Sequence, residues 1–177
     1  MLWINKKKPA GWSVYMVADL LQSLSDLPVE LRRLLKKTDF SDKVLMRLFP
    51  RAYENDSPAE EEYQRLLRED FVRQKLEGID CFEKSIARRS EVKTDLGFSI
   101  ARMDLAEEEL AMWLGFFHDL RLLIATRLDI TDENWSGENW EEVADSSNPE
   151  AKQHLLLHHL SYFEEMIVQA LRESEQL

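Results

Sequence analysis

The chain has 177 residues, of which 44% are hydrophobic and 32% charged, so it has the size and composition of one globular domain rather than of a disordered chain. Its net charge of −11 makes direct binding to DNA or RNA unfavourable, because an acidic surface repels phosphate groups. A single cysteine, Cys81, excludes an internal disulfide. No apolar stretch has the length of a membrane span, and Asp19 interrupts the only early apolar run, so we expect a cytoplasmic protein without a secretory signal.

The chain contains only five glycines and five prolines, which favours long helices over a many-turned β fold. We therefore predict a mostly α-helical single domain over residues 1–177, a helical bundle with three long helices. Residues 1–17 are the candidate for a small β-hairpin, because two stretches rich in aromatic and β-branched residues flank "PAG". Shorter helices are expected within 18–37, with a break near Pro28, and within 39–53.

The three long helices are expected at 58–88, 105–128 and 149–172. Each follows a residue whose side chain can cap a helix N-terminus: Ser57, Asp104 and Asn148. A short strand is the candidate structure for 97–103, where apolar and polar residues partly alternate. An acidic loop with two tryptophans is expected over 129–148.

The first long helix has an apolar stripe at helical spacing, and we expect this stripe to face the core. Its members are Tyr63, Leu66, Leu67, Phe71, Cys81, Phe82 and Ile86. Asp70 falls inside the stripe.

The second long helix carries three charged residues in the apolar sequence "GFFHDLRLLIATRLDI" (115–130). On a helical wheel Arg127 lies within the apolar arc, whereas Arg121 and Asp119 lie at its opposite edges. An unpaired buried charge is strongly destabilising, so we predict that Arg127 forms an ion pair with Asp70. Asp119 and Arg121 should have separate partners, because the wheel points them elsewhere.

The remaining candidates for chemistry are isolated residues. His154 and His158 have the spacing of two zinc ligands on one helix, but no third ligand accompanies them, so we interpret them as surface histidines and predict no metal and no cofactor. Cys81 is interpreted as a small core residue, with a redox-active thiol as the alternative. Trp135 and Trp140 either fold back as a flap or anchor a partner. The sequence contains no catalytic signature.

Three sequence segments, taken together, resemble a known family. They are "RLFPRAY" (47–53) followed by "EEEYQRLLREDFVRQKL" (60–76), then "WLGFFHDLRLLIATRLDIT" (113–131), then "LSYFEEMIVQAL" (160–171). In this order they are similar to a family of small helical bacterial proteins, first described as a domain of unknown function and named after the actinobacterial oxidative-stress regulator AosR. The resemblance implies a mostly helical fold, no established enzymatic activity, and regulatory binding to transcription machinery with redox-active cysteines.

The resemblance also extends to charged positions typical of the family, which are Asp70, Lys75, Asp119, Arg121 and Arg127. This chain departs from the family because Cys81 is its only cysteine, so a switch based on an internal disulfide cannot be carried over.

Two functions are compatible with the sequence. The first is a non-enzymatic protein-interaction module with a regulatory role, whose protein partner and oligomeric state the sequence leaves open. The alternative is a small-ligand-binding protein or enzyme with a charged pocket built on Asp70, Asp119, Arg121 and Arg127. The position of these side chains discriminates the two: convergence on an open cleft favours the second function, and mutual pairing in the core favours the first.

Overall fold

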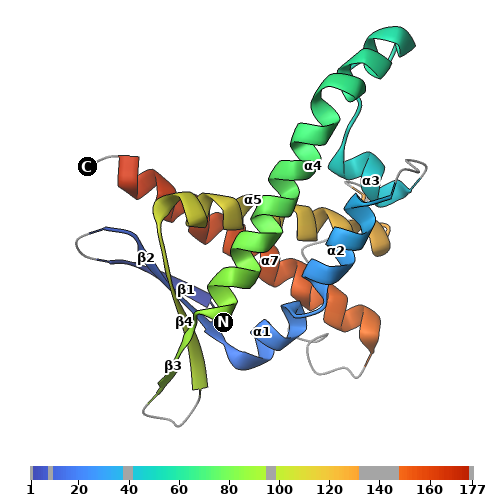
Figure 1. The fold of residues 1–177 in the computed structure, drawn as a ribbon. Coiled ribbons are helices and arrows are strands. Elements are labelled where there is room, and N and C mark those ends of the chain that lie inside the picture. The colour runs from blue at the N-terminus through green and yellow to red at the C-terminus, as the bar shows by residue number, and fades with distance from the viewer. Residues whose placement is uncertain (1, 8–9, 38–41, 95–98, 132–147, 176–177) are drawn as a thin grey trace.

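The computed structural model describes residues 2–7, 10–37, 42–94, 99–131 and 148–175, and helices make up most of them (Figure 1). In chain order the elements are β1 (Leu2–Lys6), β2 (Trp12–Val17), α1 (Ala18–Leu24), α2 (Leu27–Leu35), α3 (Lys43–Leu48), α4 (Ser57–Ala87), β3 (Ser90–Lys93), β4 (Ser99–Leu105), α5 (Glu107–Arg127) and α7 (Pro149–Glu175). The predicted mostly helical fold is therefore confirmed.

The strands form one antiparallel sheet in the order β1-β2-β4-β3. Val14 of β2 pairs with Met103 of β4, and both side chains are buried, since alternate residues of these central strands face the helices. The predicted N-terminal hairpin is β1–β2, and the predicted strand near 97–103 is β4. The sheet is nevertheless larger than expected, because β3, whose four residues are all exposed, gives no apolar pattern in the sequence.

The core lies between the sheet and the long helices, with α5 packed against both α4 and α7. Aromatic side chains connect the three helices: Phe82 of α4 lies 4.6 Å from Phe116 of α5, and Phe117 lies 5.6 Å from Phe163 of α7, measured between ring centroids. All four side chains are buried, and large buried aromatic groups contribute strongly to stability. The same buried cluster includes Leu2 and other sheet residues, so the helices do not form a separate bundle.

Two of the long helices begin close to the predicted positions. The side chain of Asp56, not of Ser57, caps α4 by accepting a hydrogen bond from the Ala59 N–H at 3.0 Å. α7 begins at Pro149 as predicted, and the Asn148 side-chain oxygen accepts a hydrogen bond within its first turn. Local capping chemistry therefore fixes both starts to within one residue.

Candidate functional site

The N-terminal end of α4 extends beyond the rest of the protein (Figure 1). From Ser57 to Glu77, all of which the structure describes, Glu60 is the one buried residue. From Gly78 onward α4 packs against α5, and its backbone comes close enough that a Cβ at Gly78 would lie 3.5 Å from the Met112 carbonyl oxygen. We call residues 57–77 the α4 arm.

A row of large apolar side chains lies on the α4 arm, all exposed except the half-buried Tyr63. Tyr63, Leu67 and Phe71 are spaced four residues apart and therefore share one side of the helix, with Leu66 beside them. Leu66, Leu67 and Phe71 are 58%, 37% and 36% exposed. Tyr53, which precedes the helix, is 48% exposed and packs edge-on against Tyr63 at 6.1 Å. We call these five residues the arm face.

The arm face corrects the prediction that the whole apolar stripe of this helix faces the core. Cys81 and Phe82, at the C-terminal end of the stripe, are buried, but Leu66 and Phe71 are not. Periodicity identifies an apolar side of a helix but not the element that covers it. Contiguous exposed apolar side chains on one element mark an interaction site more often than scattered ones do.

The residues just before α4 hold the arm in place. The Glu60 carboxylate accepts hydrogen bonds from the backbone N–H groups of Ala52 and Tyr53, each at 2.9 Å. The Tyr53 N–H bond is the main reason that the pKa of Glu60 is lowered. Two turns further along the same side of the helix, the Arg68 guanidinium lies 5.3 Å from the ring of Phe49. These contacts fix the arm while leaving the arm face uncovered by any residue that the structure describes.

An ion pair marks the junction between the α4 arm and α5. Lys75 Nζ lies 2.6 Å from Asp119 Oδ1, and the Asp119 side chain is only 4% exposed. Burial raises the pKa of Asp119, and the nearby Lys75 charge opposes this shift. Beside the pair lies a cavity of about 460 Å³ whose lining includes Gln74, Gly78 and Met112.

Arg121 has a separate partner from Asp119, as predicted. Its guanidinium pairs with the carboxylate of Glu164 on α7. His118 Nδ1 lies 3.7 Å from the same carboxylate. Burial is the largest cause of the raised pKa of Glu164. This cluster therefore connects α5 to α7, on a different side of α5 from the α4 contact.

The predicted pair between Asp70 and Arg127 does not form. Arg127 pairs with Glu30 of α2, and Asp70 pairs with Arg73 on the surface of the arm at 2.7 Å. The sequence argument assumed that α4 and α5 run side by side over their full lengths. In the structure α3 packs on α5, and Phe49, at its end, lies beneath the arm, so the two helices are held apart there.

The four charged residues proposed for a pocket do not converge. Arg121 lines a cavity of about 740 Å³ together with Arg47 and Ser161, whereas Asp119 lines the cavity at the α4–α5 junction. Asp70 lines neither cavity, and nor does Arg127. Their charges are compensated by one partner each at separate places, which is typical of structural ion pairs rather than of a catalytic group.

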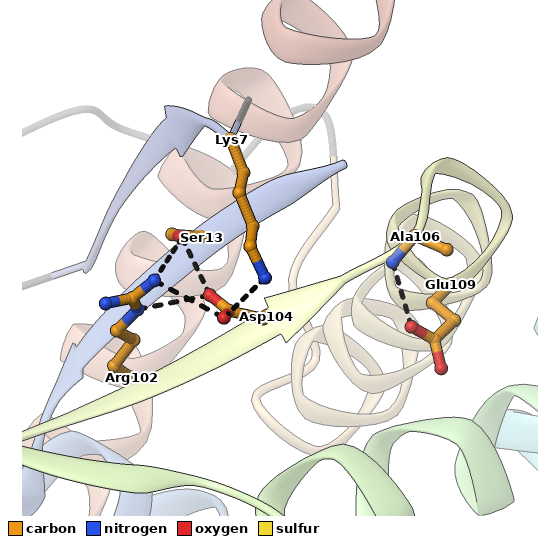
Figure 2. A network of polar contacts seen from close by, with 6 residues as sticks. All are labelled: Lys7, Ser13, Arg102, Asp104, Ala106 and Glu109. Atoms are coloured by element: carbon orange, nitrogen blue, oxygen red, sulfur yellow. Dashed lines mark hydrogen bonds and ion pairs between the residues drawn. The ribbon is translucent and has the colours of Figure 1, made fainter. Parts of the chain in front are cut away.

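A second polar network joins the strands (Figure 2). The Asp104 carboxylate accepts hydrogen bonds from Lys7 Nζ at 2.8 Å, Ser13 Oγ at 2.7 Å and Arg102 Nε at 3.1 Å. These donors, Lys7 first, lower the pKa of Asp104 to about 2. Asp104 was predicted to cap the following helix. It lies instead within β4, because β2 pairs with this segment. Just before α5, the Glu109 carboxylate accepts a hydrogen bond from the backbone N–H of Ala106.

The family comparison covers nearly the whole chain. The family described as "Domain of unknown function (DUF2017)" matches residues 5–171. The chain belongs to this family. No curated protein and no solved structure matches the chain. The DUF2017 range contains the α4 arm, the α4–α5 junction and the Asp104 network. Among the helices that the structure describes, none has both the length and the apolar content needed to cross a bilayer.

The other candidates from the sequence are placed as follows. Cys81 is buried in α4, and burial raises the pKa of its thiol, as expected for a core cysteine. His154 and His158 lie on α7, and within the described part of the chain no group of three or more His, Cys, Asp or Glu side chains could hold a metal ion. Trp135 and Trp140 lie outside the described residues.

Proposed function

We propose that this DUF2017 protein is a non-enzymatic protein-interaction module that binds its partner through the α4 arm. The observation that supports this proposal most strongly is the exposed row Leu66, Leu67 and Phe71 on a helix that extends from the core. A helix that presents apolar residues spaced three and four residues apart is a common docking element for grooves and for other helices. Glu60 fixes the start of the arm, which lowers the entropy lost on binding.

The alternative function, a ligand-binding or catalytic pocket, has weaker support. Its four charged residues lie at separate places and are each paired within the protein. The proposed regulatory role, in the cytoplasm and connected with stress or transcription, derives from the resemblance to AosR-like proteins. A surface that binds proteins is compatible with that role, whereas a catalytic centre is not required for it.

The proposal is tested by affinity capture from the native organism with quantitative mass spectrometry. Wild-type protein is compared with the Leu66→Glu and Phe71→Glu variants, which place a charge on the arm face. Val29→Glu is the matched control, because Val29 is 67% exposed on α2, away from the arm. We expect a specific partner to be retained by wild type and control and depleted at least about tenfold by both arm variants. A partner retained equally by all four baits would show that the arm is not the binding surface.

A further inference from the structure

The partner chemistry of the arm face can be specified further, on the assumption that the proposed arm-mediated binding is correct. We infer that the arm face binds a second copy of this chain, with the two α4 arms packed antiparallel around a two-fold axis near Leu67. Such an isologous contact requires a surface that is complementary to itself in both shape and charge. The arm satisfies both requirements.

The apolar residues are arranged symmetrically about Leu67. Tyr63 and Phe71 lie four residues to either side of it, on the same side of the helix. In an antiparallel pair each Tyr63 therefore lies next to the second copy's Phe71, and the two Leu67 side chains meet at the axis. The contact would cover the side chains that are now exposed in the single chain.

The charge along the arm favours the antiparallel orientation. The segment 54–62, at the tip, has five acidic residues and no basic one. The segment 63–76 has four basic and two acidic residues. An antiparallel pair places each acidic tip against the more basic segment of the other copy, whereas a parallel pair would place acidic tip against acidic tip.

The charged residues Glu62 and Arg73 lie outside the centre of this contact. They are eleven residues apart, close to three helical turns, so they share one side of the helix, but that side is turned well away from Leu67. In an antiparallel pair they would therefore lie on the outer sides of the two helices. Both side chains are exposed and now form pairs within their own helix, Glu62 with Arg65 and Arg73 with Asp70, each at 2.7 Å.

Part of the arm is free for this contact. Figure 1 shows the N-terminal end of α4 projecting from the helices and the sheet, and Leu66, Leu67 and Phe71 remain exposed although the segment that precedes α4 packs against the arm at Glu60 and Tyr63. With the axis near Leu67, the tip of the second copy, near Asp56, reaches the level of Gly78. The cavity of about 460 Å³ at the α4–α5 junction lies there and can accept that tip.

The first test is sedimentation velocity of the purified full chain over a concentration series at 0.15 M salt. We expect a monomer–dimer equilibrium for wild type. Leu67→Glu places two like charges at the axis and should weaken the dimer by at least about 30-fold, whereas the control Val29→Glu should leave it unchanged. Circular dichroism and thermal melting of each variant check that the fold is retained. A wild type that stays monomeric at ~200 µM would overturn the inference, because that concentration is far above the dissociation constant of a specific dimer.

The second test determines orientation by disulfide cross-linking in a Cys81→Ala background. Leu67→Cys, on the axis, should cross-link to itself rapidly at low micromolar concentration. Tyr63→Cys should not, because in an antiparallel pair the two copies of residue 63 are displaced by about 12 Å along the helices. Val29→Cys reports the rate of random collision. Equal rates for residues 67 and 63 would indicate a parallel pair, and rates no faster than that of residue 29 would exclude the contact.

The two proposals fail in different ways. In one outcome, wild type is monomeric and Leu67→Cys does not cross-link, but in the capture experiment a different protein binds wild type and not the arm variants. The inferred self-association is then wrong, and the arm remains a binding surface. If the chain dimerises and Leu67→Glu has no effect, the dimer uses another surface and the inference is also wrong. If the arm variants change neither association nor capture, both proposals fail.

Discussion

The two parts of α4 differ in their surroundings although they belong to one continuous helix. In the C-terminal part, Ile79, Cys81 and Phe82 are buried against α5 and the sheet. In the arm, Leu66 and Phe71 have the same apolar chemistry and remain exposed. The change occurs at the α4–α5 junction, where Gly78 lies close to Met112 and Phe116 of α5. The comparison shows that the same helical pattern can be buried in one part of a helix and exposed in the next.

The largest expected effect is on the free energy of unfolding, which should fall much more for a substitution in the buried part of α4 than for one in the arm. Phe82→Ala removes a ring that is 3% exposed and packed against three aromatic side chains of α5, so we expect a loss of about 4 kcal/mol in the free energy of unfolding. Phe71→Ala removes a ring of the same size from the arm face and should cost less than about 1 kcal/mol in the monomer. Urea unfolding at low protein concentration measures both. Similar losses for the two variants would mean that the arm face is covered within one chain.

These two phenylalanines also show what the sequence can and cannot predict. The helix positions, the N-terminal hairpin and the apolar stripe follow from local rules, since periodicity and capping depend on neighbouring residues. Whether Phe71 is buried depends on where α3 and α5 lie, which is a long-range property. The same limitation explains the error for Arg127, since its partner Glu30 lies in a short helix far away in sequence. It also explains the error for Asp104, which does not cap a helix because its segment pairs with β2.

The next prediction concerns the ion pair at the boundary between the two parts. Lys75→Met leaves the Asp119 carboxylate buried without its partner, and we expect a loss of about 3 kcal/mol at pH 7. Because burial raises the pKa of Asp119 in the folded protein, the folded state binds this proton more readily than the unfolded state does. The loss should therefore shrink as the pH falls toward the unfolded value near 4, where a neutral Asp119 tolerates burial. Urea unfolding at pH 7 and pH 5 measures the difference.

Arg73→Met is the matched control for this pair. Arg73 lies on the same arm, but its ion pairs are exposed, so its removal should cost less than about 0.5 kcal/mol at either pH. A double variant, Lys75→Met with Asp119→Leu, should recover most of the stability lost by Lys75→Met alone. A loss that is equal for Lys75 and Arg73, or that does not change with pH, would show that the junction is as hydrated as the arm.

In the Asp104 network, far from the arm, the pKa of the carboxyl group is shifted in the opposite direction from that of Asp119. Because its donors lower the pKa of Asp104 to about 2, its contribution is present above about pH 4 and is lost as the pH falls toward 2. The side chain is 40% exposed, so solvent screening reduces the effect, and we expect Asp104→Asn to cost about 1 kcal/mol at neutral pH. Urea midpoints of wild type and variant should move closer together as the pH falls from 7 to 3. A constant separation would show that the network stabilises through hydrogen bonds that do not depend on the charge.

The smallest effect tests whether Gly78 is needed for close approach at the junction. An alanine Cβ there would lie 3.5 Å from the Met112 carbonyl oxygen and 3.8 Å from the Phe116 Cβ, which are ordinary contact distances. A glycine within a helix also carries an entropic cost, so Gly78→Ala should stabilise the protein by about 0.5–1 kcal/mol. Gly115→Ala on α5, where a Cβ meets nothing within 4 Å, is the control and should stabilise by a similar amount. If thermal melting shows that Gly78→Ala destabilises while Gly115→Ala stabilises, the crossing has no room for a methyl group, and the glycine itself sets the point at which α4 leaves the core and becomes the arm.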